Sequence, residues 1–294
     1  MFDNLIGNNK IKSDLKLILK NNNIFHTYMF IGTKGIGKSE FAKEFAKGIL
    51  CTNEEKPCLK CKSCMEFNNN NNPDFYYIGL GEENSIKIDI IRQMQKKVQE
   101  LPIVSNRKVY IIDDFEYMTK EAQNCLLKTI EEPPEFVTVI LITSNESKIL
   151  NTIKSRCLKI YFNNIENEQL KQYLADKYKM NNISDNMFKS YNGSIGKAIQ
   201  MNDKEDSYKI IEKVFDNIES YNIIDATKEL EILYKDKENI NELLDYMNVI
   251  FVNKAKEDVK YIQYINAVEK VKKKLSSNCN YDMSIDSLLF NIWK

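Results

Sequence analysis

Residues 32–39 read GTKGIGKS and match the phosphate-binding pattern G-x-x-x-x-G-K-[ST] at every position. An apolar run at 28–31 precedes this loop, and apolar residues at helical spacing follow it, so the loop joins a predicted strand to a predicted helix. Such loops curl their backbone N–H groups around phosphates at the positive end of the helix. The loop comprises Gly32, Thr33, Lys34, Gly35, Ile36, Gly37, Lys38 and Ser39. We therefore predict a nucleoside triphosphate site, the alternative being an accidental glycine turn.

Two residues of this loop have separate chemical tasks. We expect Lys38 to reach the β- and γ-phosphates and the Ser39 hydroxyl to ligate Mg²⁺. A second strand, predicted at 109–112, ends in Asp113, which would emerge at the edge of the sheet where such folds bind ligands. An acidic residue at the end of a strand is common and means little by itself. Together with the glycine loop, however, it predicts that Asp113 is the carboxylate that holds the water shell of the magnesium ion, which we call the metal-side carboxylate.

The surrounding pattern indicates the fold class. Up to about residue 162, short apolar runs at 75–78, 109–112, 137–142 and 158–162 alternate with segments of helical periodicity. Strands that are apolar on both faces and alternate with helices predict an α/β domain with a parallel sheet covered on both sides. After residue 162 only helical patterns continue. We predict a nucleotide domain at 1–162, a small helical domain at 163–202 and a larger helical domain at 203–294.

Composition narrows the class of protein. The chain has 294 residues, of which 43% are apolar, so it can bury a sizeable core. Lys plus Arg and Asp plus Glu both number 42, so the whole chain has no general attraction for a polyanion. The N-terminus lacks the pattern of a secretion signal, and no run of about 18 apolar residues occurs. We expect a cytoplasmic protein with no membrane contact. The asparagine run at 68–72 is expected to be a solvated loop.

Four cysteines crowd into one short stretch just after the helix that follows the loop. Cys51, Cys58, Cys61 and Cys64 could surround one ion, and Zn²⁺ accepts four thiolates tetrahedrally. An iron–sulfur cluster is the alternative, but the ferredoxin spacing expects a further cysteine and a proline shortly after Cys64, where neither stands. The spacing therefore favours a structural zinc site.

Several motifs together resemble one family. FDNLIGN at 2–8, HTYMFIG at 26–32, LLKTIEEPP at 126–134 and SRC at 155–157 look like signatures of the bacterial clamp-loader branch of the AAA+ ATPases. The four-cysteine module after the loop helix is similar to one in that branch. The resemblance implies an AAA+ P-loop NTPase domain with a parallel sheet, a small helical lid and an all-α collar domain. ATP, Mg²⁺ and Zn²⁺ are the implied cofactors.

The same resemblance gives further residues their roles. Arg156 of the SRC motif corresponds to an arginine finger that reaches the ATP of a neighbouring subunit, although a surface charge or a structural ion pair would otherwise be the simpler interpretation. Thr143 and Ser144, at the end of the strand beside that of Asp113, are candidates for sensing the γ-phosphate or, equally, for capping the strand. Glu131 and Glu132 oppose the dipole at a helix C-terminus, so we expect tertiary or partner contacts to offset them.

The chain departs from the family's motor subunits in three features, and with these features it most resembles the delta-prime group. Motor subunits carry Asp-Glu at the strand end, whereas this chain has Asp113 and Asp114, and Asp114 is a candidate for the catalytic carboxylate despite its shorter side chain. Motor subunits carry Gly-Ser-x-Arg in the lid, whereas Gly196 stands at the arginine position and Lys197 follows it. The sequence given also ends after one helical region, without the extended tail of the longer motor subunits.

The resemblance implies that the chain forms one end of a hetero-oligomeric clamp-loader ring in the DNA polymerase III holoenzyme. This ring opens the sliding clamp and places it on primed DNA. The partners would be motor-type and delta-type subunits, with the sliding clamp and primed DNA contacted through the complex. In this interpretation the chain binds ATP and hydrolyses it slowly or not at all. The alternatives are a gamma/tau-type motor ATPase and an AAA+ protein of recombination or repair.

Overall fold

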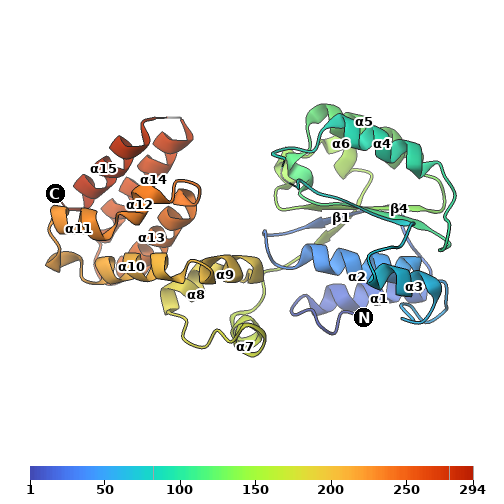
Figure 1. Cartoon of the computed structure of the whole chain (residues 1–294), viewed down its shortest axis with the longest axis horizontal. Coiled ribbons are helices and arrows are strands. Elements are labelled where there is room, and N and C mark those ends of the chain that lie inside the picture. The colour runs from blue at the N-terminus through green and yellow to red at the C-terminus, as the bar shows by residue number, and fades with distance from the viewer. Residues whose placement is uncertain (82, 278, 294) are drawn as a thin grey trace. The chain divides into compact units, whose positions relative to one another are not determined.

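The computed structural model describes residues 1–81, 83–277 and 279–293, and Figure 1 shows how the elements follow one another. The N-terminal part contains a five-stranded sheet in the order β2-β3-β4-β1-β5, with every neighbouring pair parallel. The strands are β1 (Thr27–Ile31), β2 (Phe75–Ile78), β3 (Lys108–Ile112), β4 (Val137–Thr143) and β5 (Leu158–Tyr161). The predicted α/β class with a parallel sheet is therefore confirmed.

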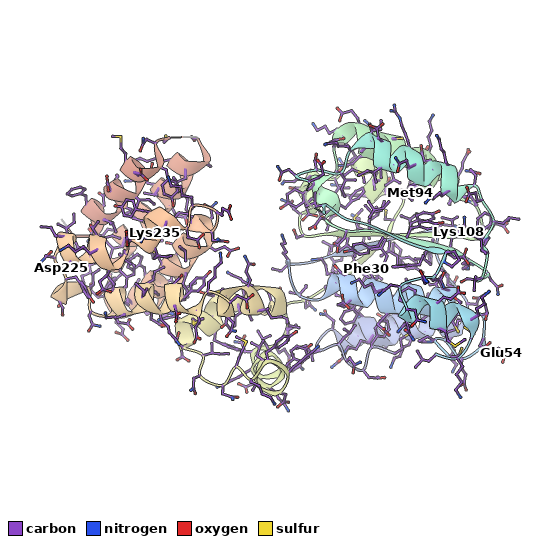
Figure 2. The ribbon with its side chains drawn as sticks, in the orientation of Figure 1. Phe30, Glu54, Met94, Lys108, Asp225 and Lys235 are labelled. Carbon is purple, nitrogen blue, oxygen red and sulfur yellow. The ribbon has the colours of Figure 1, made fainter. Side chains whose placement is uncertain are left out.

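Helices cover both faces of this sheet (Figure 1). One face carries α1 (Asn9–Lys20), α2 (Lys38–Leu50) and α3 (Lys62–Asn68), and the other carries α4 (Ile88–Val98), α5 (Lys120–Glu131) and α6 (Asn151–Lys154). Figure 2 shows Phe30 and Met94 on opposite sides of the sheet, and each belongs to a different buried cluster. The two clusters are the core of the α/β part.

The central strands are stabilised by burial of apolar side chains on both of their faces. Every residue of β1, β3 and β4 is buried. Along β1, Tyr28 and Phe30 pack into the cluster under α1 and α2, while Met29 and Ile31 pack into the cluster under α4 and α5. Full burial of a large apolar side chain contributes about 1.5–3 kcal/mol. Burial on both faces therefore fixes the positions of the strand ends, from which the loops begin.

Two local expectations differ from the structure. The asparagine run is not uniformly solvated, because Asn72 is 8% exposed and its Nδ2 donates to the Ser63 backbone oxygen over 2.9 Å. The Asn72 side-chain oxygen also accepts from the backbone N–H of Asp74. Asn72 thus ties α3 to the start of β2. The apolar residues Ile91, Met94, Val98 and Leu101 have the spacing of one helical face, which predicts a helix that reaches Leu101, but α4 ends at Val98 and Leu101 is exposed.

Among the described residues after β5, the regular secondary structure is all helical. It contains α7 (Asn167–Tyr178), α8 (Asp185–Tyr191), α9 (Ile195–Asn202), α10 (Glu205–Asp216), α11 (Ile223–Glu229), α12 (Ile232–Lys235), α13 (Ile240–Lys254), α14 (Tyr261–Ser276) and α15 (Tyr281–Ile292). Residue contacts group 1–178 and 193–196 into one compact unit, and 179–192 and 197–294 into a second. The predicted boundaries at 162 and 202 stay predictions. Among the described helices, none is both long and apolar enough to cross a bilayer.

Candidate nucleotide site

The glycine loop connects β1 to α2, as the sequence pattern predicts. Gly35 and Gly37 have φ angles of +78° and +94°, which side chains with a Cβ rarely adopt, so these glycines permit the curl of the loop. The remaining loop residues anchor it on both sides. Ile36 is buried in the core, and the Thr33 hydroxyl donates to Asn164 Oδ1 over 2.8 Å.

Lys38 is the first residue of α2 and is only 6% exposed. Its Nζ donates to the backbone oxygens of Gly32 and Thr33 over 2.7 and 2.8 Å. Burial lowers the pKa of Lys38, while the charges of Asp113 and Glu116 act in the opposite direction. The ammonium group is therefore held inside the loop, where it could exchange two carbonyl oxygens for phosphate oxygens.

Asp113 follows β3 and lies beside the loop. One carboxylate oxygen, Oδ2, accepts from Ser39 Oγ, and the other, Oδ1, accepts from the backbone N–H of Asp114 over 2.8 Å. The structure therefore brings together the predicted magnesium ligand and the predicted metal-side carboxylate, which are 74 residues apart in the chain.

Tyr77 is a residue of this site that the sequence argument missed. Its hydroxyl donates to Asp113 Oδ2 over 2.6 Å, and its ring lies under the Nζ of Lys43 at 5.5 Å from the ring centroid. Burial, followed by the hydrogen bond to Asp113, raises the pKa of Tyr77, so the phenol stays protonated as a donor. Its position in β2, the strand that pairs with β3, is a signal that could have indicated it.

The two hydroxyls at the end of β4 have different surroundings. Thr143 is 1% exposed, and its Oγ1 accepts from the backbone N–H of Asn145, so it caps the end of the strand. Ser144 is exposed, and both its backbone N–H and its hydroxyl donate to Oε1 of Glu116. Ser144 is thus the hydroxyl of the pair that can meet a ligand, and Glu116 is a second residue that sequence patterns did not indicate.

Asp114 stands where the motor subunits carry their glutamate. Its φ of 51° and ψ of 38° place it in the left-handed region, and its backbone N–H is committed to Asp113. Burial, followed by the neighbouring charge of Asp113, raises the pKa of Asp114.

A short segment after α8 closes over the glycine loop within the same compact unit. Gly196 donates its backbone N–H to the Gly35 oxygen over 2.9 Å, and the Ser194 hydroxyl donates to the Lys34 oxygen over 2.9 Å. A Cβ on Gly196 would lie 2.9 Å from Gly35 Cα, which is closer than real Cβ contacts allow. The position that holds the lid arginine in motor subunits is therefore a close approach of two backbones in this chain.

Arg156 lies between α6 and β5 and turns toward the end of α5. Its guanidinium pairs with Glu131 at 2.9 Å and donates to the Thr152 oxygen over 2.9 Å. The ion pair explains how an acid is accommodated at the C-terminus of α5, although exposed pairs of this kind contribute only about 0.2–1 kcal/mol. None of the described hydrogen bonds or ion pairs of Arg156 involves this chain's own glycine loop.

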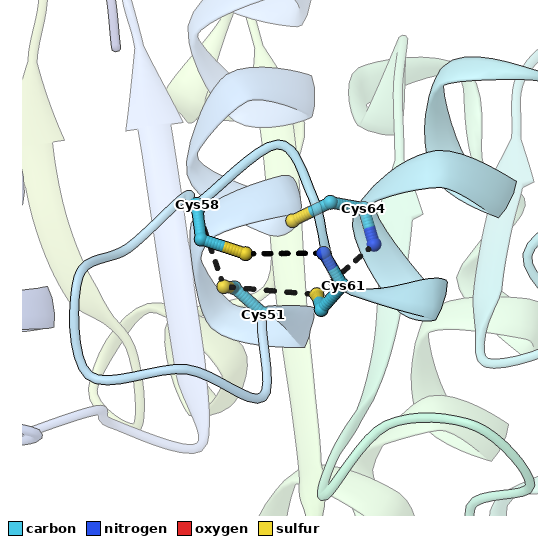
Figure 3. A group of neighbouring side chains, drawn as sticks. All are labelled: Cys51, Cys58, Cys61 and Cys64. Carbon is cyan, nitrogen blue, oxygen red and sulfur yellow. Dashed lines mark hydrogen bonds between the residues drawn. The ribbon is translucent and has the colours of Figure 1, made fainter.

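The four cysteines meet between α2 and α3 (Figure 3). All four sulfur atoms lie within 4.8 Å of one another. A tetrahedral zinc site with bonds of about 2.3 Å separates its sulfurs by about 3.8 Å, so only small adjustments would close the group around one ion. Backbone N–H groups point at the sulfurs of Cys51, Cys58 and Cys61, and such donors stabilise thiolate charge.

A parallel sheet with the strand of the glycine loop placed between β4 and β5, an aspartate after β3 and a helical region after β5 defines an AAA+ P-loop protein. The sequence narrows this class further. The model of the family described as "DNA polymerase III, delta subunit" matches residues 7–166, and the chain belongs to this clamp-loader family.

Curated relatives carry related names. The chain is 31% identical over 258 residues to "DNA polymerase III subunit tau/gamma" of Haemophilus influenzae, covering 83% of this chain and 36% of that protein. It is 33% identical over 175 residues to "DNA polymerase III subunit tau" of Escherichia coli, covering 59% of this chain and 27% of that protein. The chain therefore spans about a third or less of the length of these relatives.

Solved structures that match this chain include a "DNA polymerase III, gamma subunit-related protein" of Thermotoga maritima. It has a TM-score of 0.48 and 18% identity, and the match covers 95% of this chain and 98% of that one. A RuvB variant from the same organism has a TM-score of 0.49 and 16% identity, with 95% and 84% covered.

Proposed function

We propose that the chain is an ATP-binding subunit of a DNA polymerase III clamp loader that occupies the delta-prime position. In that position it would help to load the sliding clamp on primed DNA while hydrolysing little ATP itself. The observation that carries the proposal is the close approach of Gly196 to Gly35, which leaves no room for a side chain at the position of the lid arginine. ATP and Mg²⁺ would be held by Lys38, Ser39 and Asp113, which the fold gathers at one edge of the sheet.

The strand end after β3 supports the same proposal. A motor subunit needs a carboxylate there to orient the attacking water. Asp114 is one methylene shorter than glutamate and sits in a left-handed turn. Binding and hydrolysis are thus separable in this chain, because the groups for binding are present and those for hydrolysis are altered.

A gamma/tau-type motor subunit is the second candidate, and the sequence comparisons favour it over delta-prime. The curated relatives cited above are named gamma or tau subunits. The glycine loop and the metal-side aspartate are intact, as a motor requires. Turnover by the isolated chain separates the two candidates.

We expect steady-state ATP hydrolysis by the purified chain to be as slow as that of its Lys38→Ala variant. The physical reason is that the groups which act only in the transition state are altered, so ATP binding does not lead to fast turnover. Phosphate release is the measurement, with thermal unfolding as a check that both proteins are folded. Turnover similar to that of a motor subunit and abolished by Lys38→Ala would instead establish the second candidate.

The trans role of Arg156 is part of the same proposal. Its guanidinium is partly exposed and is held by a weak surface pair with Glu131, so a neighbour's γ-phosphate could capture it at small cost. In a reconstituted complex we expect Arg156→Ala to lower DNA-stimulated ATP hydrolysis by at least about tenfold, since arginine fingers contribute strongly to phosphoryl transfer. Arg92→Ala, which removes an exposed arginine paired with Asp89 on α4, is the matched control. An unchanged rate in Arg156→Ala would remove the assignment.

We also propose that the four cysteines hold one Zn²⁺ that fixes the connection between α2 and α3. Elemental analysis of the purified chain is expected to give one zinc ion per molecule. Cys61→Ser should lose the ion and unfold at a lower temperature, because metal binding at such sites contributes directly to folding. Cys279→Ser, at an exposed single cysteine, should keep it. A wild-type protein without zinc would refute the site.

A further inference from the structure

Glu116 is a buried carboxylate beside the nucleotide site that neither the sequence patterns nor the proposed function uses. It lies in a short 3-10 turn, Phe115–Tyr117, three residues after Asp113, and is only 6% exposed. Its Oε1 accepts from the Ser144 backbone N–H over 3.1 Å and from the Ser144 hydroxyl. Its Oε2 is buried and has no hydrogen-bond partner among the described residues.

The surroundings of Glu116 place it in electrostatic contact with the phosphate-binding loop. Its charge, together with those of Asp113 and Asp114, acts on the buried Lys38 ammonium. Three carboxyl groups therefore bear on a single loop lysine. A bound triphosphate adds more negative charge at this place than a diphosphate does, and like charges repel one another more strongly where water is partly excluded.

The hydroxyl of Ser144 has two possible acceptors. In this structure it donates to Glu116, but it is the exposed hydroxyl at the end of β4, beside the strand that leads into the glycine loop. A hydroxyl has a single proton to donate. If the Ser144 hydroxyl donates to a γ-phosphate, it must therefore give up its hydrogen bond to Glu116.

We propose that Glu116 is a positioning residue that sets how strongly the site prefers a triphosphate over a diphosphate. Its carboxylate competes with the γ-phosphate for the Ser144 hydroxyl and repels the additional charge of ATP, so ATP is bound less tightly relative to ADP than the loop alone would allow. The inference rests on nucleotide binding within the proposed function, and it is independent of assembly into a clamp loader.

Glu116→Gln is the informative substitution. An amide oxygen can still accept from both Ser144 groups, so the local hydrogen bonds and the fold are retained while the charge and the strength of the competition are reduced. If Glu116 had only a structural role, as a cap for the Ser144 amide, its replacement would affect ATP and ADP equally.

The test measures dissociation constants for ATP and ADP with Mg²⁺, by calorimetry on the full chain. We expect Glu116→Gln to raise the affinity for ATP relative to ADP by about fivefold and Ser144→Ala to lower it. The loss caused by Ser144→Ala should be larger in the Glu116→Gln background, because the hydroxyl is then more available to the phosphate. Glu121→Gln, an exposed acid in the first turn of α5, controls for a general change of charge.

An ATP-to-ADP ratio that Glu116→Gln leaves unchanged, a similar shift in Glu121→Gln, or additive effects of the two substitutions would each overturn the inference. A wild-type chain that binds neither nucleotide would overturn it together with the binding part of the proposed function. A chain that shows the expected shifts but does not join other clamp-loader subunits would leave the inference standing and contradict only the proposed place in the complex.

Discussion

The candidate nucleotide site depends on the parallel register of three buried strands. Because Ile31 pairs with Thr143, and Ile112 with Leu141, the carboxyl ends of β1, β4 and β3 lie side by side at one edge of the sheet. That alignment places Ser39 within hydrogen-bonding distance of Asp113. The strands are buried on both faces, so a one-residue shift of register would move each side chain into the other core cluster, where it would not fit, and the packing of the core therefore fixes the geometry of the site.

In the proposed function, the residues at this edge are divided between nucleotide binding and hydrolysis. The groups for binding are the glycine loop with Lys38 and the aspartate after β3, and all of them belong to this chain. Hydrolysis needs groups that converge on the γ-phosphate, and here Gly196 packs its backbone on Gly35 while Asp114 sits in a left-handed turn. Arg156 pairs with Glu131 at the end of α5, and in the proposed function it acts on a neighbour's nucleotide.

The features that could be predicted from the sequence are those determined by local patterns. The glycine loop, the strands around it and the aspartate at residue 113 follow from spacing and apolar runs, and the structure places them together. The residues that were missed depend on tertiary contacts. Tyr77 looks like an ordinary strand tyrosine until β2 is paired with β3, and Glu116 looks like a surface acid until Ser144 is brought beside it. Asn72 lies within a polar run, and only its contact with Ser63 shows that it is buried.

We infer that this edge of the sheet binds a nucleotide in the isolated chain, and calorimetric titration of the purified protein with ATP and Mg²⁺ is the decisive measurement. We expect saturable binding at one site per chain, lost in Lys38→Ala and retained in Lys209→Ala, an exposed lysine of α10 that pairs with Glu205. An absence of binding, or equal binding by the wild type and Lys38→Ala, would contradict it.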